Sequence, residues 1–338
     1  MGVLRSSTTC DIDFDKKGRQ VSVVRLGYSD NRHAYSMIPI PIAVIANGAG
    51  PTVFLAAGTH GDEYEGQVIL RRMIHSLDPA SVNGRLIIMP ALNYPAVLAS
   101  ARISPLDDGN LARVFPGEEG ASPTLSIAHF VDSKILPLCD VLMDLHSGGR
   151  AADMIPQTYL CRGSDSALNP RRLELLDIFA APLTVVAGEE ASPGYLDYSA
   201  AERYGIASFS TELGGGGGVD LEGLEVGING VNRVLHHLGV LPADPSDTKI
   251  QSSRLVTYGS GPYASANGLF EPYCVMGEEV KAGQVAGCIH PQDDPGGQSV
   301  EPKFPTDGLI VGRRVPAIVK AGDFLFSVAT DVSRDDIR

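Results

Sequence analysis

The chain alternates between short apolar runs and amphipathic segments, and this pattern predicts strands and helices in regular succession. Before residue 50, apolar segments such as VSVVRL and IPIAVIANG predict strands within 20–48 that end at a Gly/Pro turn. Beyond it, continuous apolar runs predict buried strands, and apolar residues spaced near 3.6 predict helices. The predicted strands are 52–58, 84–93, 139–146 and 205–218, and the predicted helices are 63–77, 124–136, 169–181 and 219–240. This βα alternation predicts an α/β domain with a mixed, largely parallel sheet flanked by helices.

The pattern changes after residue 240. A polar, proline-containing stretch at 241–253 predicts a linker, and no long helix is readable beyond it. Short β segments with glycine turns instead predict a small all-β domain over 250–335, resembling a barrel-sandwich of the biotinyl/lipoyl type. The predicted domains are therefore 1–245, with an N-terminal β segment at 1–48, and 250–335. The second has no modifiable lysine at a clear hairpin tip, so we expect it to be structural or a lid.

Composition narrows the class of protein. The 338 residues are 43% apolar and 20% charged, and no run approaches the roughly 18 apolar residues that a membrane span needs. The N-terminal segment lacks the apolar core of a secretory signal. Five scattered cysteines without a C-x-x-C pair fit a reducing compartment, so we expect a cytoplasmic protein. A net charge of −13 disfavours nucleic acid and anionic membranes as partners, and leaves a small-molecule substrate, with homo-oligomer formation open.

Polar side chains follow each of the four strands predicted in the main domain. His60 and Glu63 come after the first strand, Asn93 after the second, His146 after the third, and Glu212 lies at the end of the fourth. Ligands of open α/β sheets bind at the carboxyl ends of the strands. The sequence therefore predicts one polar site at this edge of the sheet.

His60, Glu63 and His146 form the ligand set of a catalytic zinc, because two imidazoles and one carboxylate leave a fourth position for water. Asp144 lies two residues before His146, on the same face of the strand, and is suited to orienting its ring. Taken alone, H-x-x-E is a weak signal, since acids at a helix start also suit the helix dipole. The other strand ends make the metal site the favoured interpretation.

Glu212 is the candidate general base, since a carboxylate beside an activated water can take its proton and pass it to a leaving amine. The glycines at 214–218 would let the backbone approach a substrate closely. A loop at 100–117 carries Arg102 and Arg113, whose guanidinium groups suit carboxylates and developing oxyanions. The alternative interpretation of each is an exposed surface charge. There is no G-x-S-x-G motif and no phosphate-binding loop.

The motifs GTHGDEYEG, LNYPA, RVFPG, DLHSGG and TELGG resemble those of the succinylglutamate desuccinylase/aspartoacylase family of zinc amidohydrolases, relatives of the metallocarboxypeptidases. The resemblance covers roughly residues 50–240, and the trailing β domain is also typical. It implies a zinc-carboxypeptidase-like fold with one zinc per chain. It also implies that His60, Glu63 and His146 bind zinc, Glu212 is the base, Arg102 polarises the scissile carbonyl and Arg113 holds a substrate carboxylate.

One departure from the family pattern concerns the substrate. The family has an asparagine before the arginine of its NR-FPG motif, and this chain has Ala112, so the carboxylate clamp is incomplete unless Asn110 substitutes. The sequence resembles the branch that deacetylates N2-acetyl-2,4-diaminobutyrate in ectoine breakdown, and we expect that substrate. Glu189, Glu190 and Asp197 are acids suited to its ammonium group, although a solvated loop explains them equally well.

Three alternatives remain open. An aspartoacylase or succinylglutamate desuccinylase would use the same metal site on a dicarboxylate. A metallocarboxypeptidase would cut peptides, although a β domain near the cleft would exclude them. A non-catalytic binding or scaffold protein would use the β domain for interaction. Metal analysis separates this last class from the enzymes.

Overall fold

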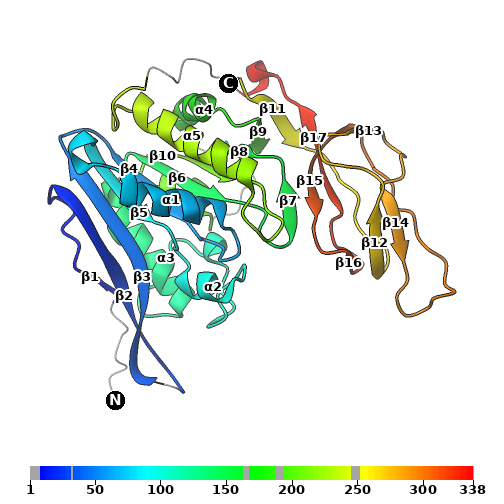
Figure 1. Cartoon of the computed structure of the whole chain (residues 1–338), viewed down its shortest axis with the longest axis horizontal. Coiled ribbons are helices and arrows are strands. Elements are labelled where there is room, and N and C mark those ends of the chain that lie inside the picture. The colour runs from blue at the N-terminus through cyan, green and yellow to red at the C-terminus, as the bar shows by residue number, and fades with distance from the viewer. Residues whose placement is uncertain (1–7, 32, 163–166, 188–193, 245–251, 338) are drawn as a thin grey trace.

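The computed structural model describes residues 8–31, 33–162, 167–187, 194–244 and 252–337. Within these ranges, fourteen strands form one mixed sheet, in which most of the strands follow the order β1-β2-β3-β5-β4-β6-β10-β8-β9-β11-β17-β15-β13 and β7 pairs with β15. The strands of the first part are β1 (Thr8–Cys10), β2 (Gly18–Asp30), β3 (His33–Asn47), β4 (Thr52–Ala57), β5 (Gly84–Met89), β6 (Val141–His146), β7 (Ala152–Met154), β8 (Gln157–Cys161), β9 (Leu183–Ala187) and β10 (Ala207–Glu212). The long β2–β3 hairpin forms one side of the molecule (Figure 1).

Helices connect the central strands and cover the sheet. The α-helices are α1 (Glu65–Ser76), α2 (Tyr94–Ala99), α3 (Pro123–Phe130), α4 (Leu168–Phe179) and α5 (Leu221–His237). Because successive residues of a strand face opposite sides, β6 contributes Met143 to the core beneath α1, α4 and α5, and Leu142 to the core beneath α3. Strands β5, β4, β6 and β10 are parallel to their neighbours in this group, as the apolar runs predict.

Several element boundaries differ from the predicted ones. The strand predicted over 84–93 ends at Met89, because the chain turns there toward α2. The predicted helix 124–136 becomes α3, then a π-helical turn (Val131–Ile135) and a 3-10 turn (Leu136–Leu138), since Pro137 lacks the N–H that a continuing helix needs. The predicted strand 205–218 stops at Glu212, before its glycines. Strands β8 and β9 were not among the predicted elements.

The chain after the predicted linker continues the large sheet. Strand β11 (Arg254–Tyr258) pairs in parallel with β9 and antiparallel with β17 (Phe326–Asp331). The remaining strands are β12 (Gly268–Pro272), β13 (Glu279–Val280), β14 (Gly287–His290), β15 (Gly308–Arg314) and β16 (Ile318–Val319). Of these, β12, β14 and β16 form a separate three-stranded sheet.

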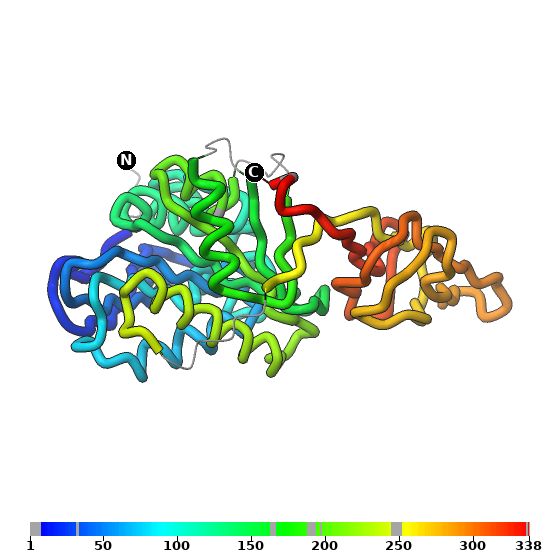
Figure 2. Tube along the Cα trace, turned by 90° about the horizontal axis from the view of Figure 1, so that it is seen from above, coloured from blue at the N-terminus to red at the C-terminus, as the bar shows by residue number. Residues whose placement is uncertain are grey.

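The C-terminal strands have a core of their own around Phe270, Phe304 and Phe326, and they project from the main body (Figures 1 and 2). No long helix occurs among the described residues beyond 253, in agreement with the predicted all-β segment. Residues 245–251 of the predicted linker lie outside the described residues, and the exact domain division stays a prediction. Among the described residues, no helix is both long and apolar enough to span a membrane.

Candidate active site

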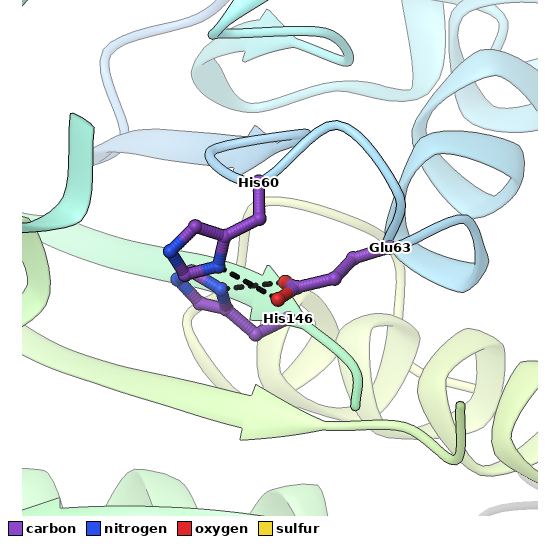
Figure 3. A group of neighbouring side chains, drawn as sticks. All are labelled: His60, Glu63 and His146. Atoms are coloured by element: carbon purple, nitrogen blue, oxygen red, sulfur yellow. Dashed lines mark hydrogen bonds and ion pairs between the residues drawn. The ribbon is translucent and has the colours of Figure 1, made fainter. Parts of the chain in front are cut away.

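The strand register brings the predicted site residues together. Strand β6 lies between β4 and β10, with Leu145 opposite Ala57 and His146 opposite Glu212. His60 therefore follows β4 at the same edge of the sheet at which β6 ends. Figure 3 shows His60 and Glu63 on the loop between β4 and α1, facing His146 at the end of β6.

The His60 loop is held closely against α2. The Asn93 N–H donates to the carbonyl of Gly58, and the Gly61 N–H donates to the carbonyl of Ala101, both at 2.9 Å. A Cβ on Gly61 would lie 2.0 Å from the carbonyl carbon of Ala96, so only glycine allows this approach. Sequence spacing and loop packing together fix the direction of the His60 ring.

The Glu63 carboxylate lies between two imidazoles. Its Oε1 is 2.7 Å from Nδ1 of His60 and its Oε2 is 2.7 Å from Nδ1 of His146. All three groups offer ligand atoms within 4.8 Å of one another. His60 and Glu63 are almost completely buried. Two neutral nitrogens and a carboxylate oxygen converging from two strand ends fit a divalent metal ion of the zinc type.

The outer nitrogens of both imidazoles have their own partners. Nε2 of His146 is 3.0 Å from Oδ2 of Asp144, whose Oδ1 accepts a hydrogen bond of 3.0 Å from the Thr59 hydroxyl. Nε2 of His60 is 3.2 Å from Oδ1 of Asn110. Each Nδ1 is thereby left to face the common centre, as in metal sites whose ligands are oriented by a second layer of hydrogen bonds.

The pKa shifts reflect the same arrangement. Burial lowers the pKa of His146, but the carboxylates of Asp144 and Glu63 raise it more, so the net shift is upward. Burial lowers the pKa of His60. For Glu63, burial raises the pKa, and the imidazoles of His146 and His60 outweigh it and lower the net value. The site thus favours positive charge beside Glu63, which a bound cation would supply.

Glu212 lies beside these ligands with its Oε2 buried and without a hydrogen-bond partner among the described residues. Burial raises the pKa of Glu212 to about 8, with the charge of Glu63 adding to the shift. A carboxyl group that exchanges its proton near neutral pH is suited to general acid–base work. Arg102 is half-exposed, and its Nη1 donates to Oε1 of Glu63 at 3.3 Å, so a guanidinium borders the same centre.

The other predicted residues take different places. Arg113 is exposed, and its guanidinium carbon lies 3.8 Å from the centre of the Tyr195 ring. The side chain of Asn110 contacts the imidazole of His60, and its backbone carbonyl accepts a hydrogen bond from the Arg113 N–H. The Asn110 side chain therefore orients the imidazole. Asn93 is fully buried, and neither side-chain polar atom has a partner among the described residues.

The acidic side chains predicted to suit the substrate ammonium lie outside the described part of the chain. Glu189 and Glu190 lie outside the described residues, as does the side chain of Asp197. The glycines of 214–217 have positive φ angles. A Cβ on Gly215 would lie 2.2 Å from the carbonyl oxygen of Ala152, so this glycine packs against the start of β7.

Two residues beside the site, Thr59 and Gln157, were not among the predicted site residues. The hydroxyl of Thr59 holds Asp144, and its position directly before His60 was a usable signal. Gln157 opens β8 and lies opposite Glu212 in the antiparallel register. No local sequence pattern indicated that Gln157 lies beside Glu212, because β8 itself was not predicted.

Comparison with known proteins places the chain among deacylases. Residues 49–238 match the family model described as the succinylglutamate desuccinylase/aspartoacylase catalytic domain. The Nα-acetyl-L-2,4-diaminobutyric acid deacetylase of Halomonas elongata is 35% identical over 333 residues, which are 96% of this chain and 95% of that protein.

Two solved structures agree closely with the fold. The product-bound ectoine utilization protein EutE (DoeB) from Ruegeria pomeroyi has a TM-score of 0.91 at 33% identity, over 96% of this chain and 99% of that one. A succinylglutamate desuccinylase/aspartoacylase from Rhodobacter sphaeroides has a TM-score of 0.89 at 38% identity, with the same shares covered. The predicted fold class is confirmed.

Proposed function

Because the chain belongs to the succinylglutamate desuccinylase/aspartoacylase family, as its motifs predicted, we propose that it is a zinc-dependent amidohydrolase that deacetylates N2-acetyl-L-2,4-diaminobutyrate. The predicted enzyme class, a deacylase, is confirmed by the family and by the named relative. The metal identity, the residue roles and the substrate are the proposed parts.

The observation that supports the mechanism most directly is the convergence of His60, Glu63 and His146 beside Glu212, whose Oε2 has no hydrogen-bond partner among the described residues. The two imidazoles would hold zinc through Nδ1 and Glu63 through its carboxylate. When bound, zinc polarises a carbonyl and makes water a stronger acid. We propose one ion per chain, because the described residues contain one such set of three ligand groups.

The protein groups then handle protons and charge. Glu212 takes a proton from the attacking water and gives it to the leaving nitrogen, so that the amide and water become acetate and a free amine. Arg102, 3.3 Å from Glu63, lies where a guanidinium can stabilise negative charge on the carbonyl oxygen. Asp144 and Asn110 keep the two imidazoles in the required orientation.

The proposed substrate rests on the relative from Halomonas elongata, which is named for this deacetylation, and on EutE, which is an ectoine utilization protein. Arg113 offers an exposed guanidinium for one α-carboxylate. Ala112 is buried and has no side-chain hydrogen-bond donor, so it cannot help to bind a second substrate carboxylate. This disfavours the dicarboxylates of aspartoacylase and of succinylglutamate desuccinylase.

A cytoplasmic setting is part of the proposal. None of the five cysteines forms a disulfide bond. Cysteines outside disulfide bonds fit the reducing compartment in which small metabolites of this type would be processed.

The test compares kcat/KM of the zinc-loaded protein for N2-acetyl-2,4-diaminobutyrate, N-acetylaspartate and N2-succinylglutamate. We expect the first to exceed the other two by several powers of ten, because the wrong side chain would leave buried polar groups unpaired. A higher value for either dicarboxylate would contradict the proposed substrate. Metal analysis that finds no zinc, together with no hydrolysis, would instead favour the scaffold alternative.

A further inference from the structure

A cluster of polar side chains next to Glu212 joins β8 of the main domain to β11 of the C-terminal segment. Nε2 of Gln157 donates to the hydroxyl of Tyr159 at 3.1 Å and to the hydroxyl of Tyr258 at 2.8 Å. The two hydroxyls also contact each other. Gln157 and Tyr159 belong to β8. Tyr258 is the last residue of β11 and lies 101 residues after Gln157 in the sequence.

The strand register places this cluster at the catalytic edge. Gln157 lies opposite Glu212, and Glu212 lies opposite His146, so the three side chains share one face of three neighbouring strands. Directly opposed residues have Cβ atoms about 5 Å apart. Gln157 is therefore the nearest neighbour of Glu212 on the side away from His146.

The hydrogen-bond count fixes the orientation of the Gln157 amide. Its two N–H groups go to the two tyrosine oxygens, and one hydroxyl proton lies between those oxygens. In the reversed amide, Oε1 and the two hydroxyl oxygens would share only two protons, so one of the three short contacts would lack a proton. The tyrosines thus hold the amide so that Oε1 remains unused.

Oε1 of Gln157 is buried and has no hydrogen-bond partner among the described residues. Gln157 as a whole is fully buried. An unpaired buried acceptor is costly, and a bound group with an N–H donor would remove that cost. An ammonium group carries three such N–H donors, whereas a carboxylate has none.

We propose that Gln157 is a specificity-determining residue whose Oε1 accepts a hydrogen bond from the side-chain ammonium of a diamino-acid substrate, and that Tyr159 and Tyr258 are positioning residues that hold its amide. The C-terminal strand β11 would thereby complete the substrate site. The inference rests on the proposed function and deepens it. It also explains discrimination against dicarboxylates, because a carboxylate oxygen would meet the amide oxygen without a proton between them.

Burial keeps the positioning hydroxyls protonated. It raises the pKa of Tyr258 to about 12 and also raises the pKa of Tyr159, with the charges of the partner tyrosine and Glu212 adding to the latter shift. Both groups consequently remain neutral hydrogen-bonding partners over the working range of an enzyme.

The test uses two substrates that differ only in the ammonium group, N2-acetyl-2,4-diaminobutyrate and N-acetyl-2-aminobutyrate, with the zinc-loaded full chain. For Gln157→Leu we expect kcat/KM to fall about 10- to 200-fold for the first substrate, mainly through KM, and to change less than about threefold for the second. Tyr258→Phe should give a smaller loss with the same selectivity. Thr158→Val is the matched control, because Thr158 lies between the two β8 residues on the opposite face and bonds to Thr184.

Equal losses for both substrates in Gln157→Leu, expressed in kcat, would overturn the inference, since they would mean that Gln157 merely supports Glu212. Zinc content and circular dichroism of each variant show whether it is folded, and Gln157→Asn provides a second variant if the leucine variant does not fold. Failure of the unaltered enzyme to hydrolyse the diamino substrate would instead contradict the proposed function. The two failures are therefore distinguishable.

Discussion

Glu212 lies directly opposite His146 in the parallel register of β10 and β6. The pairing places a carboxyl group, whose Oε2 has no hydrogen-bond partner among the described residues, beside a candidate metal ligand, although the two residues lie far apart in the sequence. The backbone ladder of two buried strands sets this relationship.

Replacing His146 by alanine should remove the metal and leave the fold. His146 ends β6, and its imidazole supplies one of the three ligand groups. We expect zinc, measured by mass spectrometry after dialysis, to fall from near one equivalent to near none, while the circular dichroism spectrum is unchanged. Full zinc occupancy in this variant would show that the ligand set is wrong.

Glu212→Gln should separate metal binding from catalysis. The amide keeps the size of the side chain and cannot take a proton from water. We expect zinc to be retained and kcat to drop by about 10²–10⁴, the usual contribution of a positioned general base. Near-normal turnover would assign the role of base to another carboxyl group.

Asn110→Ala tests whether Asn110 serves the substrate or the metal. Its Oδ1 is 3.2 Å from Nε2 of His60, so the loss should weaken zinc binding by about 10- to 100-fold, as for other residues that orient a ligand. Arg113→Ala is the contrasting variant, because it should raise KM at normal zinc affinity. Unchanged zinc affinity with a raised KM in Asn110→Ala would instead support the carboxylate clamp.

Asp107 fastens the loop that carries Arg102 and Asn110 to the start of α3. Burial raises its pKa, but the backbone N–H and the hydroxyl of Thr124, both at 2.7 Å, lower it more, so the net pKa is depressed. A depressed folded-state pKa contributes stability above the unfolded pKa of about 3.9, and that stability is lost as the pH falls through the folded value.

We therefore expect Asp107→Asn to lower the free energy of unfolding by about 1–2 kcal/mol at pH 7. The difference from the unaltered chain should shrink as the pH falls below 4. Urea unfolding of both proteins at several pH values measures this difference in the free energy of unfolding. A difference that stays constant over this range would show that the ionised carboxylate is not what stabilises the loop.

Cys139 should resist alkylation in the folded protein. Burial raises the pKa of its thiol to about 12, and Sγ donates to the carbonyl of Ile135 at 3.1 Å. Since the thiolate is the reacting form, labelling by iodoacetamide at pH 8 should be at least tenfold slower than in urea. Peptide mass mapping locates the label. Equal rates in both conditions would contradict the burial of this thiol.

The sequence by itself determined the family, the main strands and helices, and the candidate ligand pair of His60 and Glu63. These features are local: an apolar run specifies a buried strand, and a three-residue spacing on a tight loop keeps two side chains on one centre. The polar residues at the ends of four strands were also readable, because parallel strands end at a common edge.

Only the tertiary structure decided which side chains meet beyond that edge. Gln157 reaches Glu212 because β8 runs antiparallel to β10, and Tyr258 reaches Gln157 because β11 adds to the same sheet. Asn110 faces His60 because the 100–117 loop folds back over the candidate metal site. Each contact joins segments far apart in the chain, and strand register is set by pairing and packing across the whole sheet, which no local pattern of residues records.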